Sequence, residues 1–141
     1  NLLDKSLEEI TISEKIKVDI AMLLIHKPKI ILIDDMLRYL DEEDKKLVIK
    51  LLKDYQKEYK LTIILLTKDL EDTLYTDSVI VIYNKKVITY GNLASVYKDD
   101  YLEKIGFDLP FIIKLSHNLI LYDLLDKVYF TDKEVIDKLW P

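Results

Sequence analysis

Two sets of polar residues could bind a ligand or take part in catalysis. Each set lies just beyond an apolar run. Asp34 and Asp35 follow the run 30–33, and Lys68 lies just beyond a second run, 61–66. A carboxylate at the end of a strand is suited to hold a divalent cation such as Mg²⁺. A lysine is charged at neutral pH and can donate hydrogen bonds, but it does not exchange protons near neutrality as histidine does. The ordinary alternatives are two acids that cap the next turn and a lysine in solvent.

These residues are predicted to follow the strands of a βαβ unit. Residues 29–33 and 61–66 are apolar without regular alternation, which is typical of parallel strands covered by helices on both faces. Strand, helix and strand at this spacing predict a parallel sheet. Asp41 can cap the intervening helix. The predicted buried stripe of that helix is Leu47, Val48, Leu51, Leu52 and Tyr55.

The flanking segments are predicted to be helical, apart from one hairpin. Residues 14–27 carry apolar side chains at helical spacing, and Pro28 ends that helix. Residues 78–90 are predicted to form a hairpin around the turn 84–85. Four further short helices are predicted at 70–74, 101–105, 109–125 and 131–140, the last opened by a capping box of Thr131 and Glu134.

The composition excludes several classes of protein. The chain has 141 residues, 50% of them hydrophobic, which is enough for the core of one ordinary domain. The net charge is −5 and no block of Lys and Arg stands apart from acidic neighbours, so we expect no nucleic acid partner. There is no cysteine, and the longest clean apolar run, 20–25, is too short to cross a membrane. The first residue, Asn1, suggests a fragment or a processed chain.

Five segments resemble, in order and spacing, the motifs of ABC transporter ATPases. Residues 10–21 resemble the signature sequence with the helix after it, and residues 27–35 resemble the Walker B strand. Three further segments fall at the D-loop, at the strand end that carries the switch histidine, and at the strand that follows: 38–41, 67–69 and 75–81.

The tail narrows the resemblance to the energy-coupling factor (ECF) ATPases. Residues 105–111 and 131–140 are similar to the C-terminal extension of that family, and the likeness covers nearly the whole chain. It implies an α/β fold with a parallel sheet, in which residues 1–98 are the C-terminal half of a P-loop NTPase of the ABC type. Residues 99–141 are then a helical extension that helps two ATPases to pair.

The resemblance also implies catalytic roles, in altered form. Asp34 stands where the family holds Mg²⁺ through water, and Asp35 replaces the glutamate that polarises the attacking water. The missing methylene withdraws the carboxylate by roughly 1 Å, and a misplacement of that size can cost about 10²-fold in rate. Lys68 replaces the histidine that contacts the γ-phosphate.

The signature is altered further. Thr11 keeps a hydroxyl where the family has serine, whereas Ile12 and Ser13 replace two glycines and Glu14 closes the motif. Glycines let the backbone approach a phosphate at a helix N-terminus, so an ordinary helix start is favoured over a working signature. Asp41 stands at the aspartate of the D-loop.

No phosphate-binding loop of the form G-x-x-x-x-G-K-[ST] occurs in the sequence, so we do not expect this chain alone to bind ATP. In the resembled family, ATP and Mg²⁺ bind between two ATPase subunits. These join a transmembrane T component and a substrate-binding S component on the cytoplasmic face of the cell membrane. There, ATP hydrolysis drives uptake of a vitamin or metal ion.

Two other functions stay open. Because the motifs are degenerate, the chain could be a non-catalytic scaffolding or dimerisation partner of an active ATPase. A receiver-like phosphoacceptor domain is the remote alternative. That domain needs a further aspartate on a separate strand, and only one helix and one strand lie between Asp35 and Thr67.

Overall fold

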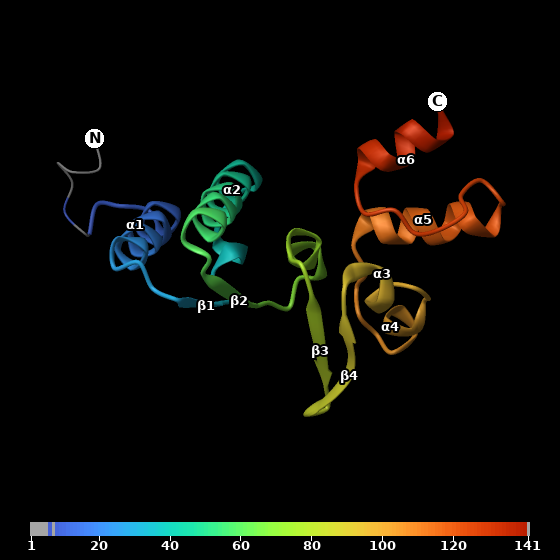
Figure 1. The fold of residues 1–141 in the computed structure, drawn as a ribbon, viewed down its shortest axis with the longest axis horizontal. Coiled ribbons are helices and arrows are strands. Elements are labelled where there is room, and N and C mark those ends of the chain that lie inside the picture. The colour runs from blue at the N-terminus through green and yellow to red at the C-terminus, as the bar shows by residue number, and fades with distance from the viewer. Residues whose placement is uncertain (1–5, 7, 141) are drawn as a thin grey trace. The chain divides into compact units, whose positions relative to one another are not determined.

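A computed structural model describes residue 6 and residues 8–140. The chain forms two compact units, Asn1–Lys68 and Asp69–Pro141, which are described separately below. Residues 1–5, 7 and 141, at the outer limits of the predicted segments 1–98 and 99–141, lie outside the described part. The predicted boundary between residues 98 and 99 stays a prediction. Figure 1 shows the elements in chain order.

The first unit contains the predicted βαβ arrangement. Its elements are α1 (Ile12–Ile25), β1 (Ile30–Asp34), the 3₁₀ turn η2 (Leu37–Tyr39), α2 (Glu42–Tyr59) and β2 (Thr62–Leu66). Strands β1 and β2 are parallel, with the register running from Ile30 opposite Thr62 to Asp34 opposite Leu66. The predicted parallel pair is therefore confirmed, and its two strands end together.

The prediction that helices cover both faces of these strands is wrong for the described residues. Ile31 and Ile33 are 4% and 3% exposed, whereas Ile30 and Leu32 on the other face are 62% and 59% exposed. Helices α1 and α2 both lie on the same side of the strands (Figure 1). The strands are apolar on both faces, as predicted. In the described part of this unit, however, helices cover only one of these two faces.

The predicted stripe of α2 is also partly wrong. Val48 and Leu52 are buried as expected, but Leu47 and Leu51 are exposed. The buried stripe is Lys45, Val48, Ile49 and Leu52, which is one helix face at spacings of three and four residues. The exposed leucines each precede a buried residue by one position, about 100° around the helix. Tyr55 is half-buried and donates its hydroxyl to the carbonyl oxygen of Leu24, which joins the two helices.

Side-chain caps fix where both helices begin. At α1, the Thr11 hydroxyl accepts from the backbone N–H of Glu14, and the Glu14 carboxylate accepts from the N–H of Thr11 at 2.8 Å. At α2, Asp41 accepts from the N–H of Asp44 at 2.8 Å, which confirms the predicted cap. Helix α1 starts two residues before its predicted start and ends at Ile25, ahead of Pro28.

The second unit combines a hairpin with short helices. Its elements are η3 (Leu70–Tyr75), β3 (Val79–Tyr83), β4 (Lys86–Gly91), α3 (Leu93–Val96), α4 (Tyr101–Lys104), α5 (Phe111–Leu121) and α6 (Asp132–Leu139). The predicted hairpin is confirmed, with β3 and β4 antiparallel and one irregularity after Val81. Asn84 and Lys85 both have positive φ angles, 48° and 62°, which suits a tight two-residue turn.

The helices of the tail are shorter than the sequence predicts. Helix α5 spans Phe111–Leu121, and not 109–125, while α6 begins with the predicted capping box of Thr131 and Glu134. The core of this unit includes Tyr97, Leu102, Leu109, Ile112, Ile113, Leu125 and Val135. Most apolar residues of the tail are therefore used inside the unit. No helix in the described part of the chain is long and apolar enough to cross a membrane.

Candidate functional site

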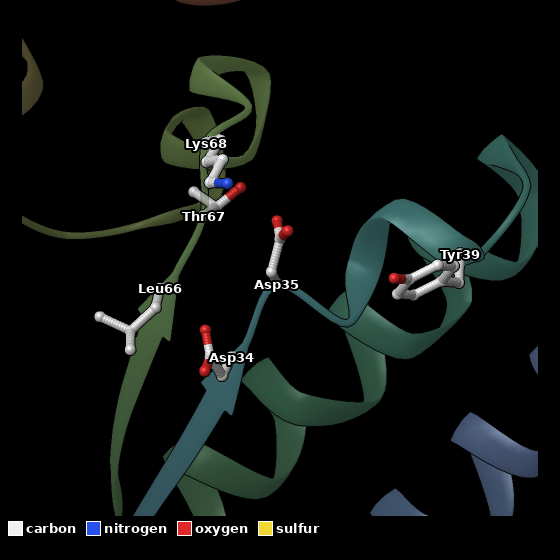
Figure 2. A pocket seen from close by; sticks show the side chains of 6 residues that line it. All are labelled: Asp34, Asp35, Tyr39, Leu66, Thr67 and Lys68. Atoms are coloured by element: carbon white, nitrogen blue, oxygen red, sulfur yellow. The ribbon is translucent and has the colours of Figure 1, made fainter.

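An open pocket of about 480 Å³ lies at the carboxyl ends of β1 and β2, within the first unit. Its lining residues are Asp34, Asp35, Tyr39, Leu66, Thr67 and Lys68. Parallel pairing brings them together because both strands end at the same edge of the sheet. Figure 2 shows the two carboxylates and the segment that carries Lys68 around this opening. Three of the predicted site residues, Asp34, Asp35 and Lys68, thus share one pocket.

Asp34 is the last residue of β1, directly opposite Leu66 in the parallel register. Side chains alternate along a strand, so Asp34 lies on the same face as Ile30 and Leu32, the face that α1 and α2 leave open. It is exposed, and its carboxylate is open to the pocket (Figure 2). Within the described part of the chain no hydrogen bond or ion pair holds this carboxylate, so it can take a cation directly.

Asp35 is held more firmly. Its N–H donates to the carbonyl oxygen of Leu66 at 2.8 Å, which continues the strand ladder by one bond. Its φ angle is 50°, in the left-handed region that aspartate enters more readily than most residues. The Arg38 guanidinium donates to the Asp35 carboxylate at 3.1 Å. This hydrogen bond and the negative charge of Asp35 raise the pKa of Arg38 above its ordinary value.

Lys68 is exposed two residues after the end of β2 and contributes positive charge to the opening. It lines the same pocket as the two carboxylates. The pocket thus offers carboxylate oxygens to a cation and an ammonium group to an anion. A cation that arrives together with a phosphate would satisfy both kinds of group.

The donor set fits Mg²⁺ only as a partial site. No group of three or more His, Cys, Asp and Glu side chains comes together among the residues that the structure describes. Mg²⁺ is usually held by one or two carboxylates, with water and substrate phosphates completing its octahedral shell. Asp34 could supply such an oxygen ligand, directly or through water, and Lys68 could contact the accompanying phosphate.

The signature residues Thr11, Ser13 and Glu14 lie elsewhere, at the start of α1, and do not line the pocket. Thr11 and Glu14 cap each other's backbone. Ser13 donates its hydroxyl to the Asp44 carboxylate. All three side chains therefore have local structural partners.

Asp41 does not line the pocket either, because its carboxylate caps α2. Tyr39, which lines the pocket, and Arg38, which is bonded to Asp35, were assigned to the D-loop from the sequence but not to the site. The spacing of three between Asp35 and Arg38 is the signal that could have found the ion pair.

The fold of this chain matches part of a solved ABC ATPase. The structure of cbiO1 from Clostridium perfringens, described as part of the ABC transporter complex cbiONQ, aligns with a TM-score of 0.60 and 32% identity. The alignment covers 78% of this chain and 45% of cbiO1. The described fold thus corresponds to part of an ABC ATPase structure. No family model matches the chain.

Curated relatives of known name point to a narrower group of ABC transporter proteins. The energy-coupling factor transporter ATP-binding protein EcfA1 of Ligilactobacillus salivarius (strain UCC118) is 40% identical over 129 residues, which are 89% of this chain and 45% of the relative. EcfA1 of Streptococcus pneumoniae (strain D39 / NCTC 7466) is 32% identical over 90% of this chain and 46% of the relative. The chain is homologous to ECF transporter ATP-binding proteins, which confirms the resemblance seen in its sequence. It spans about half the length of these relatives.

Proposed function

We propose that this chain contributes the Walker B, D-loop and switch portion of the nucleotide site in an ECF-type ATPase. The observation that carries the proposal is the single pocket that gathers Asp34, Asp35 and Lys68 at the ends of two parallel strands. The homology to ECF ATP-binding proteins supports the same function.

Each of these residues has a task in such a site. Asp34 would hold Mg²⁺ through water, and the cation would supply positive charge beside the phosphates. Asp35 orients the attacking water, and Lys68 donates a hydrogen bond to the terminal phosphate. Thr11, Ser13 and Glu14 occupy the place of the signature that faces the partner subunit's site, but their side chains cap α1 or bind Asp44. Asp41 occupies the place of the D-loop aspartate.

The same residues favour slow hydrolysis of ATP. Asp35 has a shorter reach than glutamate, and its carboxylate is already paired with Arg38. A charged lysine in place of histidine can hold a phosphate but cannot exchange protons near neutrality. We therefore infer a weakly active, degenerate energy-coupling subunit.

A scaffolding role is the second candidate, because apolar side chains remain exposed after both units fold. In the tail, Phe111 and Trp140 are 68% and 73% exposed. Such side chains favour pairing with a second ATPase subunit. We propose the further partners of an ECF transporter, namely the T and S components, and a peripheral position on the cytoplasmic face of the membrane.

A chimera tests the catalytic proposal. The matched 129-residue segment of the Ligilactobacillus salivarius relative is replaced by the corresponding segment of this chain, and Mg²⁺-dependent ATP hydrolysis is measured. We expect slow hydrolysis that Asp34→Asn abolishes. Asp54→Asn, on an exposed part of α2 outside the pocket, serves as the matched control. A folded chimera that binds ATP but responds equally to both substitutions would contradict the proposal.

A further inference from the structure

The ion pair between Arg38 and Asp35 brings a second positive charge next to the pocket. The Nη1 atom of Arg38 lies 3.1 Å from Oδ2 of Asp35, and their side chains are 56% and 29% exposed. The pair thus joins a solvent-facing guanidinium to a carboxylate that is largely sheltered. With Asp34 and Lys68, the four side chains sum to no net charge.

Asp35 is fixed from two sides. Its backbone N–H is bonded to the carbonyl of Leu66 at 2.8 Å, and its carboxylate is bonded to Arg38. The Arg38 guanidinium also lies 5.4 Å from the ring centre of Tyr39, a pocket residue, within the range of a cation–π contact. Two neighbours therefore orient the guanidinium: the Asp35 carboxylate, whose negative charge it neutralises, and the Tyr39 ring.

We propose that Arg38 is a positioning residue that holds the Asp35 carboxylate and keeps it from a divalent cation in the pocket. This inference rests on the proposed function in assuming that a cation binds beside Asp34. A guanidinium and a cation compete for the same carboxylate oxygens, so the paired Asp35 is a poorer ligand than Asp34. The chain then binds a free cation through one carboxylate and depends on a phosphate for tighter binding.

The test measures binding of Mn²⁺, used as a probe for Mg²⁺, to the intact chain by electron paramagnetic resonance of the free ion. Because an exposed ion pair is weak, we expect Arg38→Gln to tighten Mn²⁺ binding only about 1.5- to fivefold. Lys29→Gln removes the same charge at the opposite end of β1 and is the matched control. It should leave the dissociation constant nearly unchanged.

A double-mutant cycle separates pairing from simple charge. In an Asp35→Asn background, Arg38→Gln should lose its effect, because the carboxylate that it would release is gone. An equal gain in both backgrounds would show that Arg38 acts only through its charge and would overturn the inference. Absence of any gain, or of Mn²⁺ binding by the Arg38→Gln protein, would overturn it as well.

A readout without metal tests the pair itself. Rotation of the Arg38 guanidinium, followed by nitrogen NMR, should be slowed in the parent chain and released by Asp35→Asn. Free rotation in the parent chain would contradict the inference. Asp34→Asn separates the two proposals: if it leaves Mn²⁺ binding unchanged, the proposed cation role of Asp34 fails, while the cycle at Arg38 still decides the present inference.

Discussion

The ammonium group of Lys17 lies 2.8 Å from the carboxylate of Asp44 and ties the second turn of α1 to the first turn of α2. Ser13 donates its hydroxyl to the same carboxylate. Hydrogen bonds from Lys17 and then from Ser13 hold the pKa of Asp44 below its ordinary value. The two helices that cover the parallel strands are thus joined by one ionised group.

This ion pair predicts a pH dependence of stability. Because the pKa of Asp44 is lower in the folded chain, its contribution is fully present above the ordinary aspartate value of about 3.9 and is lost as the pH falls through the folded pKa. Asp44→Asn should destabilise the chain at pH 7 and much less at pH 2. Thermal unfolding followed by circular dichroism checks this, with Asp54→Asn on the same helix as control. Equal destabilisation at both pH values would contradict it.

A second prediction concerns nucleotide. Since the sequence contains no phosphate-binding loop, we expect no heat of ATP binding from the isolated chain at millimolar Mg-ATP. Isothermal titration calorimetry checks this directly. Micromolar affinity at a stoichiometry of one to one would require a different nucleotide site from the one proposed.

A third prediction concerns Asp35 and Lys68 in their proposed catalytic roles. In the chimera, Asp35→Glu should raise the rate of hydrolysis by up to about 10²-fold, because it restores roughly 1 Å of reach. Lys68→His should add a smaller gain that depends on pH near neutrality. Phosphate release assays at several pH values measure both. A rate unaffected by either change would favour the scaffolding role.

A fourth prediction concerns a buried hydrogen bond in the second unit. The Thr73 hydroxyl lies 2.6 Å from the Tyr97 hydroxyl and donates to the carbonyl oxygen of Leu70. Tyr97→Phe leaves Thr73 with that second partner and should cost about 1 kcal/mol. Thr73→Val leaves the buried hydroxyl of Tyr97 without this hydrogen bond and should lower the free energy of unfolding by about 1–3 kcal/mol. Denaturant unfolding compares the two, and a larger loss from Tyr97→Phe would contradict this assignment.

A fifth prediction concerns association. Phe111 and Trp140 are the tail residues to replace, because Leu115 is half-buried and helps the unit to fold. Replacing both with aspartate should weaken self-association of the isolated chain about tenfold or more. Asn118→Asp, an exposed polar position of α5, is the control. Light scattering measures the association. A monomer at high concentration, unchanged by these substitutions, would contradict the prediction that the tail is an interface.

The local elements were largely predictable because their signals are local. The Asp41 cap, the capping box of Thr131 and Glu134 and the hairpin turn at Asn84 each depend on a few adjacent residues, and the structure contains all three. The parallel pair followed from two apolar runs with a helix between them. That pair, in turn, brings Asp34 and Lys68 into one pocket.

What the sequence did not predict depends on tertiary contacts. Leu47 and Val48 are adjacent and similar in polarity, so only the packing of α2 decides that Val48 is buried and Leu47 exposed. The ladder bond from Asp35 to the carbonyl of Leu66 needs the paired strand, and pattern alone does not reveal it. Likewise, the pattern of the tail does not show that Leu109 and Ile112 fill the core of the second unit.

The backbone at Asp35 has a consequence for how this site can change over generations. With a φ angle of 50°, the position suits aspartate, asparagine or glycine. Most other side chains cost about 1–2 kcal/mol in the left-handed region. Asp35→Glu would therefore lengthen the carboxylate arm of the proposed site and destabilise the turn at once. A gain in reach at this position therefore carries a cost in stability, which a second substitution that relaxes the turn would remove.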